Sequence, residues 1–380
     1  MSQAGPQRPL EFGGEPDQRA VIEFLADPAS HGGQPVRCFE THGNLVFVAG
    51  DDAFKVKRAV RFDYMDFSTL GKRRAACERE VAVNRRCGGD LYVGAIPIRR
   101  LPNGRLSLGG DGAIIDWAVR MRRFEQKALL SERARIAGID SALAKQVADA
   151  VYACHDGADC APRSSGLEAL QELCRSIAVG LKGQGVFADK DIDRLAVGLS
   201  QQLDAAAGVL NQRAQRGYVR RCHGDLHLAN IVLWRGQPVL YDAIEFDEAL
   251  ATIDTLYDLA FLLMDLDVHG LRPAANVVLN HYLWLSGDDW HLRGLPALPA
   301  FLALRAAVRA RVMGDRAGQQ PAHVRSKAIA DARRFLDAAL SYLVPPAPEL
   351  MAVGGFSGTG KSTLAAALAP WIGARRGQCI

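Results

Sequence analysis

The first third of the chain alternates between short apolar segments and turn residues, a pattern that predicts a small β-sheet. Residues 45–49 and 53–57 are strand-like and are separated by the turn Gly50-Asp51-Asp52. Ser68 can cap a helix that runs to about Arg86, before Cys87-Gly88-Gly89. Three more strands are predicted at residues 92–99, 105–108 and 114–121, with Asn103-Gly104 as a hairpin turn. We expect a flexible N-terminus over residues 1–20 and a sheet-rich unit over residues 21–122.

From about residue 123 the apolar positions change to helical spacing. Leucines and alanines over residues 195–210 recur at helical intervals, and Gly217 ends the run. Two short strands at 231–234 and 239–241 interrupt the helices, and helical segments then continue from 253 to about 343. The pattern predicts an α+β protein with a mainly helical unit over residues 123–343.

Composition indicates which broad class of protein this is but not which reaction it catalyses. The 380 residues carry a net charge of +4 and are 49% hydrophobic, which fits a globular chain and is too mildly basic to indicate nucleic-acid binding. The eight cysteines form no C-x-x-C pair, which favours reduced thiols over a zinc site. We find no signal peptide and no apolar run of the ~18 residues that a membrane span needs. We therefore expect a cytoplasmic protein with no membrane or nucleic-acid partner.

The most specific chemical signal lies between residues 223 and 242. Phosphoryl transfer to a hydroxyl needs a carboxylate that orients the hydroxyl and accepts its proton, and oxygen ligands for Mg²⁺. Asp225, in His-Gly-Asp, is predicted to be this catalytic base, and Asn230 follows it by five residues. Asp242 comes after the next two strands. Asn230 and Asp242 are predicted metal ligands, and Glu245 can add a further oxygen.

This ordered set resembles the aminoglycoside phosphotransferase-like family, whose members carry H-G-D-x-x-x-x-N and share the protein-kinase fold. The resemblance spans about residues 35–343. It implies a two-lobed kinase-like fold with a sheet-rich N-lobe and a helical C-lobe. It also implies ATP and Mg²⁺ as cofactors and a small-molecule hydroxyl as the phosphate acceptor.

The same resemblance suggests which charged residues hold the nucleotide phosphates. Ala53-Phe54-Lys55 matches the end of the V-A-I-K strand and makes Lys55 the favoured phosphate lysine, with Lys57 as its rival. Glu80, on the helix after Ser68, is the favoured partner of this lysine, with Glu78 as its rival.

The chain departs from the family pattern at the nucleotide-binding strands. It has no G-x-G-x-x-G, and His42-Gly43-Asn44 stands in its place. Residues 119–121 lie where family members turn backbone groups toward adenine, although Val and Met there also suit plain packing.

Several charged residues of the helical unit allow two interpretations. We predict structural roles for His155 and His227. Asp258 either braces the catalytic loop or is a charge on a helix surface. Arg305 and Arg309 lie one helical turn apart and either face an anionic substrate or lie on a surface, with the surface favoured.

A second nucleotide motif stands near the C-terminus. The sequence from Gly355 to Thr363 is a complete Walker A motif, in which backbone N–H groups cradle phosphates and a lysine adds charge. We expect a strand over residues 350–353 before it and a helix after it. The predicted nucleotide-binding residues are Gly355, Gly358, Gly360, Lys361, Ser362 and Thr363.

This segment resembles the start of P-loop small-molecule kinases, which some bacterial proteins fuse to a phosphotransferase-like domain. A Pro-rich linker over residues 344–350 precedes it. Since 351–380 contain no Walker B aspartate and no further parallel strands, we expect a truncated fragment of a P-loop domain.

The sequence leaves three hypotheses open. The leading one is an ATP- and Mg²⁺-dependent phosphotransferase that acts on a small-molecule hydroxyl. The second places the main activity in a longer P-loop kinase domain and gives the kinase-like part a regulatory role. The third is a nucleotide-binding module without catalysis.

Overall fold

The structure, a computed structural model, describes residues 16–41, 43–62, 65–161, 166–318, 322–344 and 351–372. It divides into two units, which we call the sheet unit and the helical unit. The sheet unit comprises Met1–Glu125 and Glu245–Asp247, and the helical unit comprises Gln126–Ile244 and Glu248–Ile380.

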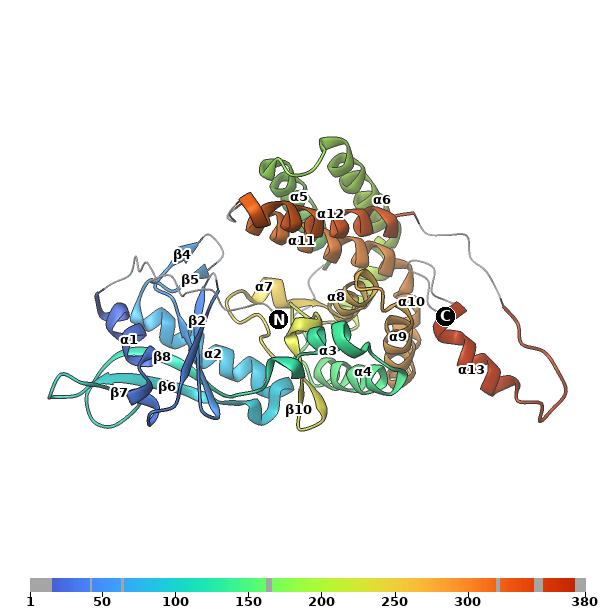
Figure 1. Cartoon of the computed structure of the whole chain (residues 1–380). Coiled ribbons are helices and arrows are strands. Elements are labelled where there is room, and N and C mark those ends of the chain that lie inside the picture. The colour runs from blue at the N-terminus through green and yellow to red at the C-terminus, as the bar shows by residue number, and fades with distance from the viewer. Residues whose placement is uncertain are drawn as a thin grey trace. The chain divides into compact units, whose positions relative to one another are not determined.

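The sheet unit is built on a six-stranded antiparallel sheet with the order β1-β2-β3-β8-β6-β7 (Figure 1). Five of these strands cover or overlap the predicted strands, and β1 was not predicted. Their bounds are β1 Val36–Glu40, β2 Asn44–Ala49, β3 Asp52–Lys57, β6 Tyr92–Arg100, β7 Leu106–Ser107 and β8 Ala113–Arg122. A separate ribbon pairs β4 (Arg61–Phe62) with β5 (Met65–Asp66).

Helices α1 (Pro16–Ala26) and α2 (Leu70–Gly88) pack on opposite faces of this sheet. Because strand side chains alternate between faces, Phe54 and Val56 of β3 join the apolar core with α1, whereas Lys55 and Lys57 point toward α2. The sheet therefore presents two lysines side by side on its α2 face.

Two local predictions need correction in the sheet unit. Residues 16–20 belong to α1, where the sequence suggested flexible chain, because Gln18 is buried and donates to the backbone oxygen of Lys57 at 2.9 Å. The cap of α2 is Thr69 rather than Ser68. The Ser68 hydroxyl donates instead to Asp66, and this contact removes it from the helix end.

Within the described residues, the helical unit contains the remaining long helices, two two-stranded sheets and two isolated β-bridges. The spaced residues of 195–210 are buried on α6 as predicted. The helices are α3 Leu130–Ala137, α4 Ser141–Asp156, α5 Gly166–Gln184, α6 Asp189–Gln215, α7 Glu248–Ala251, α8 Thr255–Val268, α9 Arg272–Ser286, α10 Asp289–Arg293, α11 Leu298–Gly318 and α12 Ala322–Tyr342. The strands are β9 Val219–Arg221, β10 Ile231–Trp234, β11 Gln237–Leu240 and β12 Thr252–Asp254.

The hairpin of β10 and β11 is tighter than predicted. Arg235 and Gly236 have φ values of 52° and 81°, so these two residues alone make the turn. Such left-handed pairs match the twist of the flanking strands. Gln237 and Pro238, predicted as turn, are therefore the first residues of β11.

The C-terminal segment forms a loop and a helix. Helix α13 spans Lys361–Ile372, as predicted, but Met351–Val353 form no strand. A strand needs a neighbour to take its backbone hydrogen bonds, and none is paired with these residues in the described chain. Leu350 and the prolines at 345–348 lie outside the described residues.

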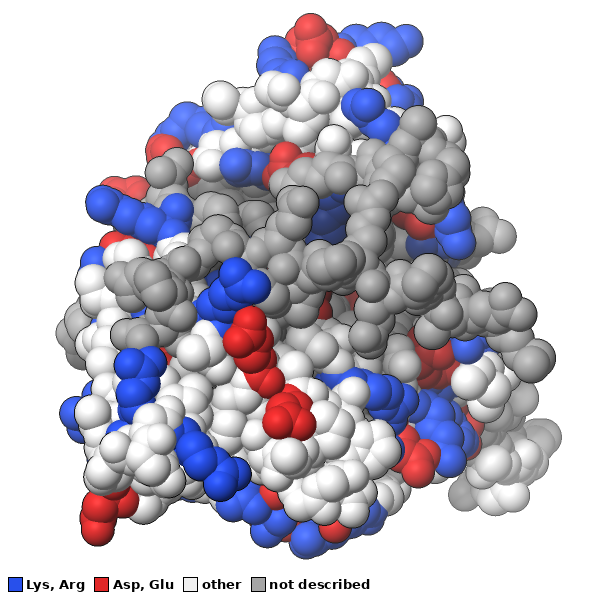
Figure 2. Space-filling model, turned by 60° about the vertical axis from the view of Figure 1, so that its left-hand side comes forward, with Lys and Arg blue, Asp and Glu red and all other residues white. Residues whose placement is uncertain are grey.

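Among the helices that the structure describes, none is long and apolar enough to cross a membrane. Lysines, arginines and acidic residues are interspersed over the face drawn in Figure 2.

The expectation of reduced thiols fails for Cys87 and Cys154, which are both disulfide-bonded. Five other described cysteines are free, and Cys379 lies outside the described residues.

Candidate active site

The His-Gly-Asp segment forms a loop between β9 and β10, and the ring of His223 fixes its shape. His223 Nδ1 accepts a hydrogen bond from the backbone N–H of Asp225 at 3.3 Å, and Nε2 contacts the backbone oxygen of Tyr241 at 2.9 Å. Because Nδ1 accepts, Nε2 carries the proton and donates. Burial lowers the pKa of His223, which favours this neutral form. One ring therefore joins the segment of Asp225 to the segment of Asp242.

Asp225 presents one carboxylate oxygen to solvent. Its Oδ2 accepts from Asn230 Nδ2 at 2.9 Å and contacts His227 Nε2 at 3.3 Å. No donor among the described residues reaches Oδ1, and the side chain is 40% exposed. Burial raises the pKa of Asp225, but the contact with His227 and the charge of Arg309 together outweigh burial and hold the pKa below its usual range. Asp225 is therefore a charged acceptor with a free oxygen.

Asn230 orients the carboxylate of Asp225 and keeps its own side-chain oxygen without a donor among the described residues. Its Nδ2 donates to both the backbone oxygen and Oδ2 of Asp225, each at 2.9 Å. Within the described chain no donor contacts its Oδ1, so this oxygen is left for another partner. An amide oxygen beside carboxylates suits Mg²⁺.

Asp242 follows β11 in a conformation that non-glycine residues rarely adopt. Its φ is 62°, in the left-handed region, which costs about 1 kcal/mol for most L-residues and less for Asp. The preceding Tyr241 is held by its N–H to the backbone oxygen of Asn230 at 3.0 Å and by its hydroxyl to that of Ala229 at 2.8 Å. The negative charges of Asp225 and Asp242 both act on the ring of His223. Asp225 and Asp242 thus both lie near one histidine, and Asn230 is bonded to Asp225.

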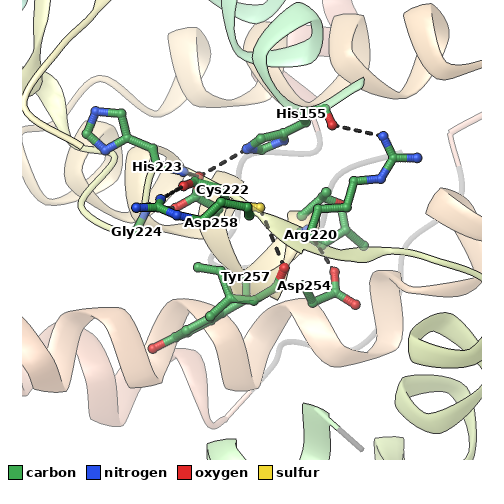
Figure 3. A network of polar contacts seen from close by, with 12 residues as sticks. His155, Arg220, Cys222, His223, Gly224, Asp254, Tyr257 and Asp258 are labelled. Carbon is green, nitrogen blue, oxygen red and sulfur yellow. Dashed lines mark hydrogen bonds and ion pairs between the residues drawn. The ribbon is translucent and has the colours of Figure 1, made fainter. Parts of the chain in front are cut away.

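Asp258 of α8 braces this loop, which settles the choice left open by the sequence. Its two oxygens accept from the backbone N–H groups of His223 and Gly224, each at 3.0 Å (Figure 3). His155 Nε2 contacts Oδ2 at 3.1 Å and its Nδ1 contacts the Tyr282 hydroxyl at 2.9 Å. Asp258 is fully buried, so it is not a surface charge.

His155 and His227 both have structural contacts, as predicted. His227 caps the turn Leu228–Asn230 by accepting from the backbone N–H of Ala229 at 3.2 Å. With Nδ1 accepting, its Nε2 carries the proton and points to Asp225. His155, Cys222 and Asp258 place three potential ligand atoms within 4.8 Å of one another, but both ring nitrogens of His155 are already hydrogen-bonded.

Arg305 is a buried anchor, and the favoured prediction of a surface face was wrong for it. Its Nη1 donates to the backbone oxygen of Gly224 at 3.0 Å and its Nε to that of Tyr257 at 3.2 Å. The guanidinium also lies 3.8 Å from the ring centre of Tyr257. α11 is thereby attached to the residue before Asp225.

The sheet unit carries a second cluster of charges. Glu80 of α2 accepts from Lys55 Nζ at 2.9 Å and from Lys57 Nζ at 2.5 Å. Burial raises the pKa of Glu80, but the two lysines outweigh it and lower the pKa to about 2. Glu78, the rival partner, instead forms an exposed pair with Arg74. Both predicted lysines therefore share the one buried glutamate.

Lys57 and Lys55 differ in what else holds them. Lys57 is completely buried and also donates to Glu245, a residue grouped with the sheet unit. Glu245 was predicted as an extra metal ligand, but this ion pair with Lys57 occupies it instead. Lys55 keeps some exposure, at 8%.

Residues 119–121, for which the sequence allowed either backbone groups turned toward adenine or plain packing, lie within the sheet, as the packing interpretation expects. β8 lies between β3 and β6, and Val119 is paired with Lys55 on one side and Ala95 on the other. The ladder uses these backbone groups on both sides. His42, in the segment that replaces the glycine-rich loop, lies outside the described residues.

The Walker A segment has the backbone of a glycine loop before a helix. Its glycines Gly355, Gly358 and Gly360 have φ values of 152°, 78° and 80°, which other residues rarely adopt. The Lys361 ammonium donates to the backbone oxygen of Phe356 at 2.5 Å. Ser362 and Thr363 are exposed in the first turn of α13.

Sequence reasoning named Glu245 and Arg305 but missed the contacts that each of them makes within its own unit. The ion pair of Glu245 with Lys57 joins residues 188 positions apart, and no local pattern marks it. For Arg305 the sequence showed only that it lies one helical turn from Arg309. Its contacts depend on how α11 packs against α8, which the sequence does not show.

Comparisons with known proteins find relatives that are longer than this chain. No protein-family model matches. Uncharacterised proteins of Mycobacterium tuberculosis and Mycobacterium bovis are each 32% identical over 345 residues, which is 88% of this chain and 65% of each relative. The chain therefore spans slightly less than two thirds of the length of these relatives.

Three solved structures illustrate the structural likeness. A GDP complex of aminoglycoside 2'-phosphotransferase-IIIa has a TM-score of 0.48 at 14% identity and covers 86% of this chain and 99% of its own. A choline/ethanolamine kinase family protein from Mesorhizobium loti has 0.46 at 16%, covering 86% and 98%. Choline kinase from Cryptosporidium parvum has 0.49 at 11%, covering 86% and 95%. Because each TM-score lies below 0.5, these likenesses do not identify the fold or function of this chain.

Proposed function

We propose that this chain is a kinase-like phosphotransferase that moves the γ-phosphoryl group of ATP to a hydroxyl of a small molecule. The observation that carries the proposal is the link made by His223. Its ring holds the segment of Asp225 through Nδ1 and the segment of Asp242 through Nε2. A base and a metal-binding carboxylate held on one rigid support are what this transfer requires.

Asp225 acts as the base in this proposal. The acceptor hydroxyl donates to the free Oδ1 while Oδ2 stays bonded to Asn230. As the hydroxyl oxygen bonds to the γ-phosphorus, the bond from that phosphorus to the bridging oxygen breaks. ADP leaves with the electron pair of that bond, and the hydroxyl proton passes to Asp225. The lowered pKa of this carboxylate keeps it ionised at neutral pH, so its free oxygen can accept a hydrogen bond from the acceptor hydroxyl and orient it.

The remaining residues bind and orient. Asn230 Oδ1 and the carboxylate of Asp242 would hold Mg²⁺, which neutralises phosphate charge when bound. Lys55 would bind phosphate oxygens, since it is paired to Glu80 yet keeps some exposure. Lys57 would instead support Glu80 and Glu245 from a fully buried position. Cytoplasmic location fits this use of ATP.

A screen of small-molecule alcohols with Mg-ATP tests the proposal. Product formation is followed by mass spectrometry, with Asp225→Asn as the matched control. We expect at least one phosphorylated product with the native chain and none with the variant. Equal product from both would overturn the assignment of Asp225.

A second candidate is nucleotide binding at the Walker A segment, favoured by its three left-handed glycines before α13. In this alternative, residues 351–372 belong to a P-loop domain and the kinase-like part regulates it or only binds nucleotide. Lys361→Ala separates the two candidates. If ATP turnover by this chain survives the substitution, the turnover belongs to Asp225, and if turnover is lost, it belongs to the P-loop.

A further inference from the structure

One buried face of helix α8 supports the loop of Asp225. Asp258, Phe261 and Asp265 follow one another at helical spacings of three and four residues, so they lie on the same side of the helix. Their exposed fractions are 0%, 1% and 4%, and the ring of Phe261 packs edge-on against that of His227 at 5.4 Å. A buried carboxylate is costly unless its oxygens accept hydrogen bonds. The face therefore offers the loop two carboxylates, of which Asp258 is already assigned.

Asp265 holds the loop on the other side of Asp225 from Asp258. Its Oδ2 accepts from the backbone N–H of Leu228 at 2.9 Å, whereas Asp258 accepts from the N–H groups of the two residues before Asp225. Its Oδ1 lies 3.4 Å from His269 Nδ1, which donates to the backbone oxygen of Asp265 at 2.7 Å. The loop is thus held by α8 at both ends, and Asp265 uses one oxygen to do so.

Leu228 begins the turn that carries both partners of Asp225 Oδ2. His227 is the N-cap of this turn and Asn230 is its last residue. Their side chains contact Oδ2 at 3.3 Å and 2.9 Å. The N–H of Leu228 belongs to the planar peptide that follows His227, so the bond to Asp265 restrains the backbone from which the His227 ring extends. The same bond therefore restrains the two groups that occupy Oδ2 and leave Oδ1 free.

We propose that Asp265 is a positioning residue for the phosphoryl transfer assigned to Asp225. It acts through the backbone of Leu228 and not by contact with the acceptor or the nucleotide. This inference rests on the proposed function and adds to it a residue that sets the direction of the base. Such support matters because a base displaced by about 1 Å can lose about 10²-fold in turnover.

Two substitutions of Asp265 separate its acceptor oxygen from its charge. Asp265→Ala removes the acceptor of the Leu228 N–H, whereas Asp265→Asn keeps one oxygen that can accept the same bond. Asp191→Ala is the matched control. Asp191 is 6% exposed and accepts from Arg333 at 2.8 Å, in a contact between α6 and α12 of the same unit.

Turnover is measured as release of labelled phosphate from γ-labelled Mg-ATP, with water and with glycerol as acceptors. Mg-ATP is kept saturating, because Asn230 belongs to the same turn and its displacement can weaken metal binding. Hydrogen exchange over residues 226–231, followed by mass spectrometry, reports the turn itself and does not depend on activity. Circular dichroism confirms that each variant folds.

Asp265→Ala should lower kcat by about 10²-fold, and Asp265→Asn should recover most of the loss. Exchange over residues 226–231 should rise in the alanine variant and stay native in the asparagine variant. Asp191→Ala should lower the unfolding midpoint but keep native kcat and native exchange in this segment. Native kcat or native exchange in Asp265→Ala overturns the inference, and so does an asparagine variant no better than alanine.

Adding Asp265→Ala to Asp225→Ala distinguishes positioning of the base from general support of the fold. Once the carboxylate of Asp225 is gone there is no base to position, so the second substitution should lower the residual turnover much less than it lowers native turnover. An equal loss in both backgrounds overturns the inference.

Failure of the inference is distinguishable from failure of the proposed function. A native chain that binds Mg-ATP but transfers phosphate to no acceptor overturns the proposed function, and the inference with it. A native chain that transfers phosphate, with Asp265→Ala equally active, overturns the inference alone.

Discussion

Replacing Asp258 by Asn should loosen the loop of Asp225 and destabilise the protein. The carboxylate accepts from two backbone N–H groups and contacts His155 and Arg305, all in a site closed to water. Asparagine keeps one acceptor oxygen and places an NH₂ group where the other oxygen was. That NH₂ would face the His223 N–H, a donor against a donor.

The expected size of the effect follows from these contacts. A hydrogen bond to a charged group contributes about 1.5–3 kcal/mol, and removing one member of a buried ion pair costs about 3–5 kcal/mol. Since the lost contacts belong to one network, we take about 3–5 kcal/mol as the total loss in unfolding free energy. A loop displaced by about 1 Å can also lose about 10²-fold in turnover.

Urea unfolding followed by circular dichroism gives the stability, and ATP-dependent product formation gives the turnover. Asp267→Asn is the matched control, because Asp267 lies on the same helix but is partly exposed in its pairing with Arg272. The control should lose about 1 kcal/mol and retain its turnover. If Asp258→Asn is as stable and as active as Asp267→Asn, the brace assigned to Asp258 is wrong.

Three further outcomes follow from the charged residues. Lys57→Met should lower the unfolding free energy by about 3–5 kcal/mol, because Lys57 is fully buried in its ion pairs. Lys55→Met should mainly weaken ATP binding. Chemical unfolding and ATP titration of both variants compare the two effects. Asp242→Asn should weaken Mg-dependent ATP binding more than Asp225→Ala does, and equal affinities by calorimetry would argue against separate roles. Because the folded pKa of Glu80 is lowered from 4.5 to about 2, its stabilising effect is present above pH 4.5 and is lost as pH falls toward 2. Glu80→Gln should flatten this acid dependence in thermal unfolding between pH 5 and pH 2, and an unchanged slope would contradict it.

The sequence predicted much of the sheet, and it located the His-Gly-Asp loop to which we assign catalysis, because both have local signals. The alternation of β2 and β3 is visible within a few residues, and His-Gly-Asp fixes the place of Asp225. The braces could not be predicted in the same way. Asp258 and Arg305 act through contacts made by packed helices distant in sequence, and the preference for a surface position at Arg305 followed from its charge alone. The strand expected at 350–353 is not formed by its described residues, 351–353, for a related reason. A strand depends on a hydrogen-bonding partner elsewhere in the chain, which the local sequence does not specify.

The most direct test of the account is ATP-dependent phosphorylation by Asp225→Ala, measured beside ATP binding by the same protein. The account predicts that turnover falls by about 10²–10⁴-fold while Mg-ATP affinity stays close to the native value, because a general base acts mainly in the transition state. Native turnover in the variant would contradict the role assigned to Asp225. Loss of both ATP binding and turnover in a variant that still folds would contradict it as well.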